Sequence, residues 1–209
     1  MTRFEFTPVP RIIFGCGELR KVGELAAGLR RRAFVVHSGS APAEELADVL
    51  AAAGVEAVGR VQRGEPTVDD VNQAAEEARS RECQLVIGIG GGSAIDAAKA
   101  VAGLLGNGGV AEDYMEVVGR GQKISRPAAP WIAIPTTAGT GAEVTRNAVI
   151  GFPERRFKAS MRSELLLPRV ALVDPELGVE VPPAVTASSG MDALCQLIES
   201  YTSTHCCPR

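Results

Sequence analysis

Residues 88–99, GIGGGSAIDAAK, have the residue types that bind phosphate groups through the main chain. They follow the apolar stretch 85–89, which predicts a strand, and lead into a segment with helical spacing that begins at Ser93. Gly91 and Gly92 leave the backbone open to a ligand, and a helix N-terminus adds unpaired N–H groups and the positive end of the helix dipole. We expect Ser93 to cap this helix and Asp96 to close a capping box. The segment predicts a site for a nucleotide diphosphate; the alternative is a tight turn without a ligand.

A second polar cluster, PTTAGTG at 135–141, follows another apolar strand. Its hydroxyl groups suit a ribose or a phosphate, although a plain polar turn would have the same composition. Because the carboxyl ends of parallel strands meet at one edge of a sheet, we expect the two loops to converge there. The usual dinucleotide fingerprint G-x-G-x-x-G fails, since Ser93 stands where the third glycine belongs, so an ordinary Rossmann domain fits poorly.

Strands and helices alternate along most of the chain, which predicts an α/β fold with a parallel sheet covered on both faces. The predicted strands are 11–14, 33–36, 55–61, 85–89, 131–134, 146–152 and 169–173. The predicted helices are 19–29, 42–53, 67–81, 93–105 and one that begins near 182, with a single turn near Asp113. We expect Thr67 to cap the third helix, and Gly190 to kink or restart the last one.

Composition narrows the class of protein. The chain has 209 residues, a net charge of −3 and few aromatic residues, which argues against a nucleic-acid-binding face. No apolar run approaches the ~20 residues of a membrane span, and the first residues lack a signal-peptide core, so we expect a cytoplasmic protein. The five cysteines form no C-x-x-C pair and suit reduced thiols.

Five segments together resemble the iron-containing (group III) alcohol dehydrogenase family. They are GEPT at 64–67, GIGGGSAIDAAKA at 88–100, IPTTAGTGAEVTRNAVI at 134–150, LLLPRVALVDPEL at 165–177 and PPAVTASSGMDAL at 182–194. The resemblance implies an α/β dinucleotide-binding domain followed by an all-helical domain, with the active site between them. By this comparison, residues 1–181 are the first domain, and residues 182–209 are the opening helix of a helical, metal-binding domain that is otherwise missing.

The resemblance also implies roles for individual residues. The positions that match cofactor-binding residues are Gly91, Gly92, Ser93, Asp96, Thr136, Thr137, Thr140, Thr145, Asn147, Lys158, Leu177 and Val181. Asp192 matches the first metal ligand, but Gln196 stands where the family has a histidine one turn later. An amide oxygen is a weaker ligand than imidazole for Fe2+ or Zn2+, so a metal in this chain is in question. Its two histidines, His37 and His205, are more readily explained as ordinary polar residues.

The family activity is NAD(P)-dependent oxidation of an alcohol to a carbonyl compound, and the reverse. NADP stays open beside NAD, because residues 36–40 carry serines and no carboxylate that would repel a 2′-phosphate. No residue suggests itself as a catalytic base. We expect this chain to bind dinucleotide weakly, with little or no turnover of a small alcohol or aldehyde, and a homodimer is possible. The alternatives are a non-catalytic nucleotide-binding or interaction module and a dehydroquinate-synthase-like lyase.

Overall fold

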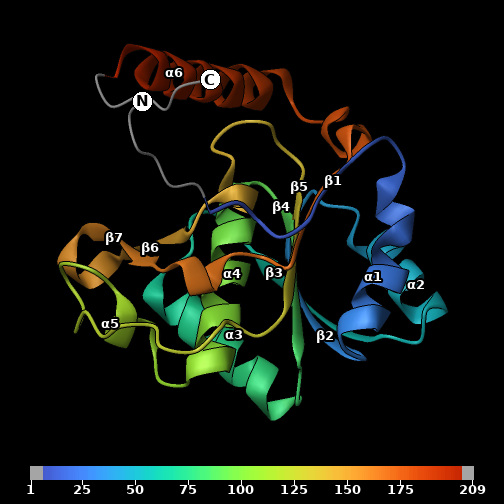
Figure 1. Cartoon of the computed structure of the whole chain (residues 1–209), viewed down its shortest axis with the longest axis horizontal. Helices are drawn as coiled ribbons and strands as arrows, with labels where there is room; N and C mark the ends of the chain where they lie inside the picture. Colours follow the sequence, from blue (N-terminus) through green and yellow to red (C-terminus); the bar gives the residue numbers. More distant parts are fainter. Residues whose placement is uncertain (1–6, 204–209) are drawn as a thin grey trace.

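A six-stranded parallel sheet forms the centre of the molecule (Figure 1). The computed structural model describes residues 7–203. The strand order is β1-β8-β5-β4-β2-β3. The bounds are β1 Ile12–Phe14, β2 Arg32–Ser38, β3 Glu56–Gln62, β4 Leu85–Gly90, β5 Trp131–Pro135 and β8 Val170–Val173. All neighbouring strands run parallel, so the predicted α/β class is confirmed.

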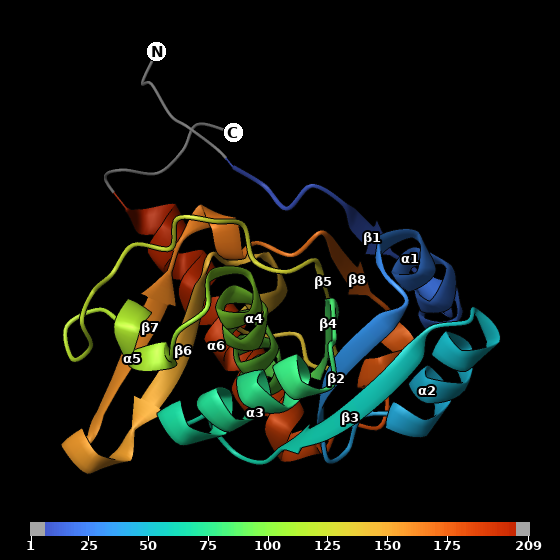
Figure 2. The same ribbon diagram turned by 90° about the horizontal axis from the view of Figure 1, so that it is seen from below.

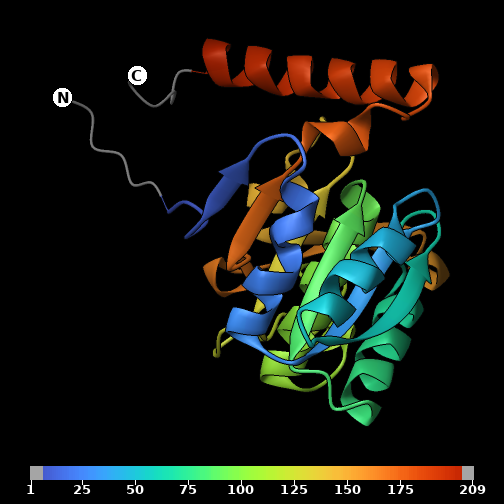
Figure 3. The ribbon, with the colours of Figure 1, turned by 90° about the vertical axis from the view of Figure 1, so that its right-hand side faces the viewer.

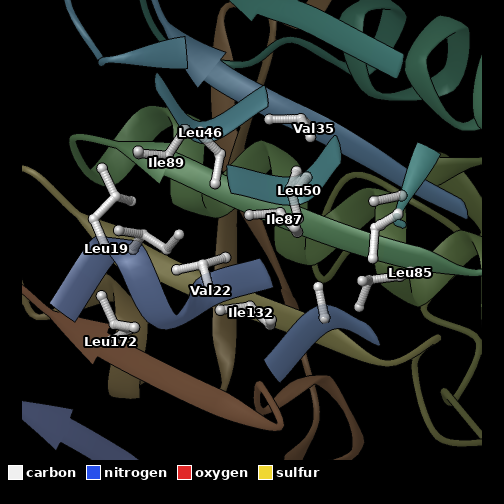
Figure 4. Close-up of a cluster of buried hydrophobic side chains, with 14 of the residues drawn as sticks. Leu19, Val22, Val35, Leu46, Leu50, Leu85, Ile87, Ile89, Ile132 and Leu172 are labelled. Atoms are coloured by element: carbon white, nitrogen blue, oxygen red, sulfur yellow. The ribbon is translucent and has the colours of Figure 1, made fainter. Parts of the chain in front are cut away.

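Helices cover both faces of this sheet (Figure 2). On one face, α1 (Val22–Leu29) and α2 (Ala43–Ala52) pack against Val35, Ile87 and neighbouring side chains in one buried cluster (Figure 4). On the other face, α3 (Val68–Ser80) and α4 (Gly92–Asn107) pack against Phe34 and Val86. Side chains in a strand alternate between faces, so neighbours such as Phe34 and Val35 enter different clusters. Thr67 caps α3, as predicted, and Asp70 completes a capping box with it.

A small antiparallel hairpin lies beside α4. It consists of β6 (Asn147–Phe152) and β7 (Phe157–Arg162), and it closes a third buried cluster with α3, α4 and the short helix α5 (Ala111–Tyr114). The sequence analysis missed β7, because only Ala159 and Met161 of its sequence, FKASMR, are buried, while Ser160 is half-buried and the other three residues are exposed. The remaining short helices are η1 (Glu18–Lys21), η2 (Ala142–Val144), η3 (Pro153–Arg155), η4 (Glu164–Leu166) and η5 (Pro175–Gly178).

Asp174, at the end of β8, ties two of these short helices to the sheet. Its buried carboxylate accepts hydrogen bonds from the backbone N–H groups of Gly17 (3.1 Å), Leu19 (3.0 Å) and Glu176 (3.1 Å). A carboxylate with several N–H donors satisfies groups that would otherwise be buried without partners. Asp174 therefore holds the start of η1 and the start of η5 at the end of β8.

The last helix, α6 (Pro183–Thr202), lies across the carboxyl ends of the strands (Figure 3). It is one continuous helix, so the prediction of a restart at Gly190 is wrong; helical packing tolerates a single glycine. Most of α6 is exposed, and a closely packed contact with the sheet domain joins Ser189 to Gly139. Among residues 7–203, no helix is long and apolar enough to cross a membrane.

Candidate dinucleotide site

The connection from β4 to α4 leaves the start of a long helix open. The helix begins at Gly92, with Gly91 as its N-cap, and no side chain caps it. The prediction that Ser93 is the N-cap and Asp96 its capping partner is therefore wrong. The N-cap is Gly91, two residues before Ser93, so Ser93 lies inside the first turn of the helix. Asp96 instead accepts a hydrogen bond from the Val149 N–H of β6 (3.1 Å). The first N–H groups of an α-helix have no partner within it, so those of α4 are available to a ligand.

Each glycine of this loop stands where a side chain would clash or fill space, for a different reason at each position. A Cβ at Gly88 would lie 2.6 Å from the Cβ of Ala98, so this glycine lets α4 pack closely on β4. Gly90 has a φ of +148°, and a Cβ there would lie 2.9 Å from Ser38 Oγ. At Gly91 and Gly92, a Cβ would instead meet hydroxyl groups of the second loop. The last two glycines therefore keep the space between the two loops free of side chains.

The two predicted loops do converge. β4 and β5 are neighbours in the sheet, and the Thr136 N–H donates to the Gly90 carbonyl at 2.9 Å. The Cβ positions of Gly91 and Gly92 are 3.6 Å from Thr137 Oγ1 and 3.2 Å from Thr140 Oγ1, respectively. The convergence at one sheet edge is confirmed.

A cavity of about 560 Å³ opens at this point, of a size that takes a cofactor or small ligand. Eight of the predicted site residues line it: Gly92, Ser93, Asp96, Thr137, Thr140, Thr145, Asn147 and Asp192. Thr136 and Val181 line an adjoining hollow of about 470 Å³, and Leu177 lines a third of about 580 Å³. Gly91 and Gln196 line none of the three hollows at this end of the sheet. Lys158 is exposed and forms an ion pair with Glu65, which lines the first cavity.

Lys99, which the sequence analysis passed over, is the most unusual residue beside the cavity. Its side chain is fully buried (0 % exposed), and its ammonium group donates to the Ala142 carbonyl (2.8 Å), Thr145 Oγ1 (2.9 Å) and the Asn147 carbonyl (2.7 Å). Asp96 Oδ1 lies 3.7 Å away. Burial lowers the pKa of Lys99 to about 8, and burial also raises the pKa of Asp96. A lysine three residues after an aspartate on a predicted helix was the available signal.

The predicted metal ligands Asp192 and Gln196 lie one turn apart on α6. Gln196 Nε2 donates to Asp192 Oδ2 at 3.2 Å, so the amide group is engaged with the carboxylate. Within residues 7–203, no three His, Cys, Asp or Glu side chains lie close enough together to hold a metal ion. One carboxylate and one amide do not make a donor set for iron or zinc, so the described residues do not fit a metal. His37 Nδ1 lies 3.1 Å from the Ser38 carbonyl, and His205 lies outside the described residues.

Comparison with known proteins agrees with this architecture. The family model for iron-containing alcohol dehydrogenase matches residues 9–175. The chain is 35 % identical to the NAD-dependent methanol dehydrogenase of Bacillus methanolicus, over 100 % of this chain and 55 % of that protein. It is 36 % identical to choline dehydrogenase of Bacillus subtilis, over 97 % of this chain and 52 % of that protein.

A solved structure is also closely similar. Sulfoacetaldehyde reductase from Bifidobacterium kashiwanohense, determined in complex with NAD+, superimposes with a TM-score of 0.90 at 33 % identity, over 100 % of this chain and 56 % of that chain. The chain belongs to the iron-containing alcohol dehydrogenase family. It spans about half the length of these relatives.

Proposed function

We propose that this chain is the dinucleotide-binding part of an NAD(P)-dependent alcohol dehydrogenase. The observation that supports the proposal is the uncapped N-terminus of α4, which faces Thr137 and Thr140 across one cavity. An anion at such a position accepts hydrogen bonds from the main chain and meets the positive end of the helix dipole. When bound, the nicotinamide supplies the chemistry, since it accepts hydride from an alcohol carbon or returns it to a carbonyl.

The residues of the chain bind and orient the cofactor in this proposal. Main-chain N–H groups of residues 91–93 hold the diphosphate, while the hydroxyl groups of Thr137 and Thr140 contact it from the second loop. Val181 supplies an apolar contact in the adjoining hollow, and Leu177 supplies one in the hollow beyond it. The alcohol or aldehyde class follows from the family, and we assign no catalytic base. We derive no metal-assisted step, because the described donor set does not fit a metal.

We propose that both NAD and NADP bind and that NAD binds more tightly. Ser38, at the end of β2, has a buried Oγ without a partner among the described residues, and residues 36–40 carry no carboxylate that would repel a 2′-phosphate. However, the hollow that Ser40 lines carries Glu45, Glu176 and Glu180 against Arg20. A 2′-phosphate close to three carboxylates is disfavoured.

Calorimetric titration with NAD+, NADH, NADP+ and NADPH tests the proposal directly. We expect weak but saturable binding of the dinucleotides, tighter for NAD+ and NADH than for NADP+ and NADPH. We also expect little or no alcohol turnover by this chain alone. An absence of heat with every coenzyme at millimolar concentration from folded protein would refute the dinucleotide site. Steady NADH production together with stoichiometric iron or zinc would refute the expectation for activity and metal.

A non-catalytic interaction module is the second candidate, and exposed apolar residues of α6 favour it. The large ones are Val185, Met191, Leu194, Leu197, Ile198 and Tyr201. The edge strand β1 adds Phe14, which is 74 % exposed, and a homodimer through that edge is part of this proposal. Sedimentation velocity tests it: a monomer at all concentrations would contradict it. Family membership favours the oxidoreductase over the lyase considered from the sequence.

A further inference from the structure

Lys99 connects the phosphate-facing helix to the opposite wall of the cavity. An ammonium group has three N–H bonds, and Lys99 uses them on three acceptors: the Ala142 carbonyl, Thr145 Oγ1 and the Asn147 carbonyl. These acceptors lie in η2 (Ala142), directly after it (Thr145) and at the start of β6 (Asn147), whereas Lys99 belongs to α4. The carboxylate of Asp96, on the same helix, lies 3.7 Å away. Every one of these four partners lines the dinucleotide cavity, although Lys99 itself does not.

We propose that Lys99 is a positioning residue whose protonated form clamps residues 142–147 to α4, so that the cavity loses affinity for the dinucleotide when this lysine loses its proton. The proposal rests on the function proposed above. A neutral amine has two N–H bonds and a lone pair, so at least one of the three acceptors would be left without its donor in a buried site. Because Thr145 and Asn147 form part of the cavity wall, loss of the clamp changes the shape that a ligand meets.

The surroundings of Lys99 bring this change within an accessible pH range. Burial lowers its pKa to about 8, against the opposing effects of Asp96 on its own helix and Glu143 on η2. From the sheet, the ring of Trp131 on β5 faces the ammonium at 6.0 Å. A lysine whose pKa is lower in the folded state binds fewer protons there than in the unfolded chain between about pH 8 and its ordinary pKa of roughly 10.4. Over that range the titration of Lys99 itself makes the folded state more stable as the pH rises, so deprotonation of this lysine does not unfold the protein.

The chain has a single tryptophan, which makes the titration visible. Trp131 fluorescence should show a step near pH 8 in the wild type and in the control Lys21→Met, whose lysine forms an exposed ion pair with Glu18. The step should be absent in Lys99→Met, which has a side chain of similar length without a charge. A wild-type signal that is flat across this range, or a step that persists in Lys99→Met, would refute the titration.

Binding completes the test. Loss of one hydrogen bond to a charged group predicts that the dissociation constant of NAD+ rises about tenfold between pH 7 and pH 9.5 in the wild type and in Lys21→Met. Lys99→Met should bind as weakly as the high-pH wild type at both pH values. Thr145→Val removes one acceptor and keeps the lysine, so it should weaken binding at pH 7 by a smaller factor. Equal wild-type affinity at the two pH values, or wild-type affinity in Lys99→Met, would refute the proposal.

A measurement without ligand separates this proposal from the proposed function. If the wild type binds no dinucleotide at either pH, the function fails, and amide hydrogen exchange of residues 142–147 tests the clamp alone. After correction for the intrinsic pH dependence of exchange, the protection of this segment should fall above pH 8 in the wild type and be low throughout in Lys99→Met. Unchanged protection in both proteins would refute the clamp.

Discussion

A methyl group at Gly92 should separate binding from folding, because it affects them in opposite directions. The Cβ of Gly92→Ala would lie 3.2 Å from Thr140 Oγ1, at the mouth of the uncapped helix. It would therefore enter the space between the main-chain N–H groups and the threonine hydroxyl. Alanine is also a better helix former than glycine, by up to about 1 kcal/mol in a helix interior and less at a first residue.

The magnitude follows from what the ligand would lose. Displacing a diphosphate oxygen from one main-chain N–H costs a hydrogen bond to a charged group, which contributes about 1.5–3 kcal/mol. At about 1.4 kcal/mol for each tenfold change, the dissociation constant of NAD+ should rise by a factor of roughly 10 to 150. The melting temperature should stay the same or rise by roughly 1–4 °C for a domain of this size.

Calorimetry with NAD+ and thermal unfolding on the same preparations measure both effects. Gly28→Ala is the matched control, since it makes the same substitution in α1, where a Cβ would have nothing within 4 Å. We expect the control to gain stability and to bind as the wild type does. If Gly92→Ala binds NAD+ with wild-type affinity, the main-chain amides of this loop do not hold the diphosphate, and the assignment of the site is wrong.

Three further predictions concern other parts of the molecule. Asp174→Ala should lower the free energy of unfolding by about 2–4 kcal/mol, measured by urea denaturation, because three backbone N–H groups lose their acceptor; an unchanged midpoint would contradict this. Gln196→His should raise the affinity for Zn2+ in calorimetry at least about tenfold over Leu197→His, which places the imidazole away from the face of Asp192; equal affinities would contradict it. Glu45→Lys should improve the affinity for NADP+ relative to NAD+ roughly threefold at low salt, whereas Glu44→Lys, which does not line the hollow, should leave that ratio unchanged; the same ratio in both variants would count against the acidic hollow.

The sequence predicts the central sheet well, because apolar strands and amphipathic helices alternate with clear turn residues between them. Thr67 is a good example, since its hydroxyl and an aspartate three residues later specify a helix start without any tertiary contact. The hairpin strand β7 could not be predicted in this way. Its two buried residues, Ala159 and Met161, enter the cluster that the hairpin shares with α3 and α4, and the exposed residues on either side of them weaken the local signal.

The site was predictable in outline and not in detail. Glycines followed by small hydroxyl residues are typical of phosphate-binding loops, and the structure brings both loops to one edge of the sheet. The cap of α4 was mispredicted because Ser93 and Asp96 have the right types and spacing for a local motif, while Asp96 instead bonds to β6 across the molecule. Lys99 was missed for a related reason: a lysine on a helix is ordinarily exposed, and only the tertiary fold places three acceptors around this one.

The charges around the cavity show why the main chain must carry most of the binding. Glu65, Asp96 and Asp192 line the cavity, and no lysine or arginine is among the described residues that do. Lys158 is near the rim, but Glu65 pairs with it, and the positive charge of Lys99 is enclosed behind the wall. A diphosphate in this cavity would therefore meet an excess of negative side chains, and its favourable contacts would be main-chain N–H groups, the dipole of α4 and the neutral hydroxyl groups of Thr137 and Thr140. It follows that removing Lys158 should weaken binding far less than a methyl group at Gly92, which is the reverse of the order expected for a site built on side-chain charge.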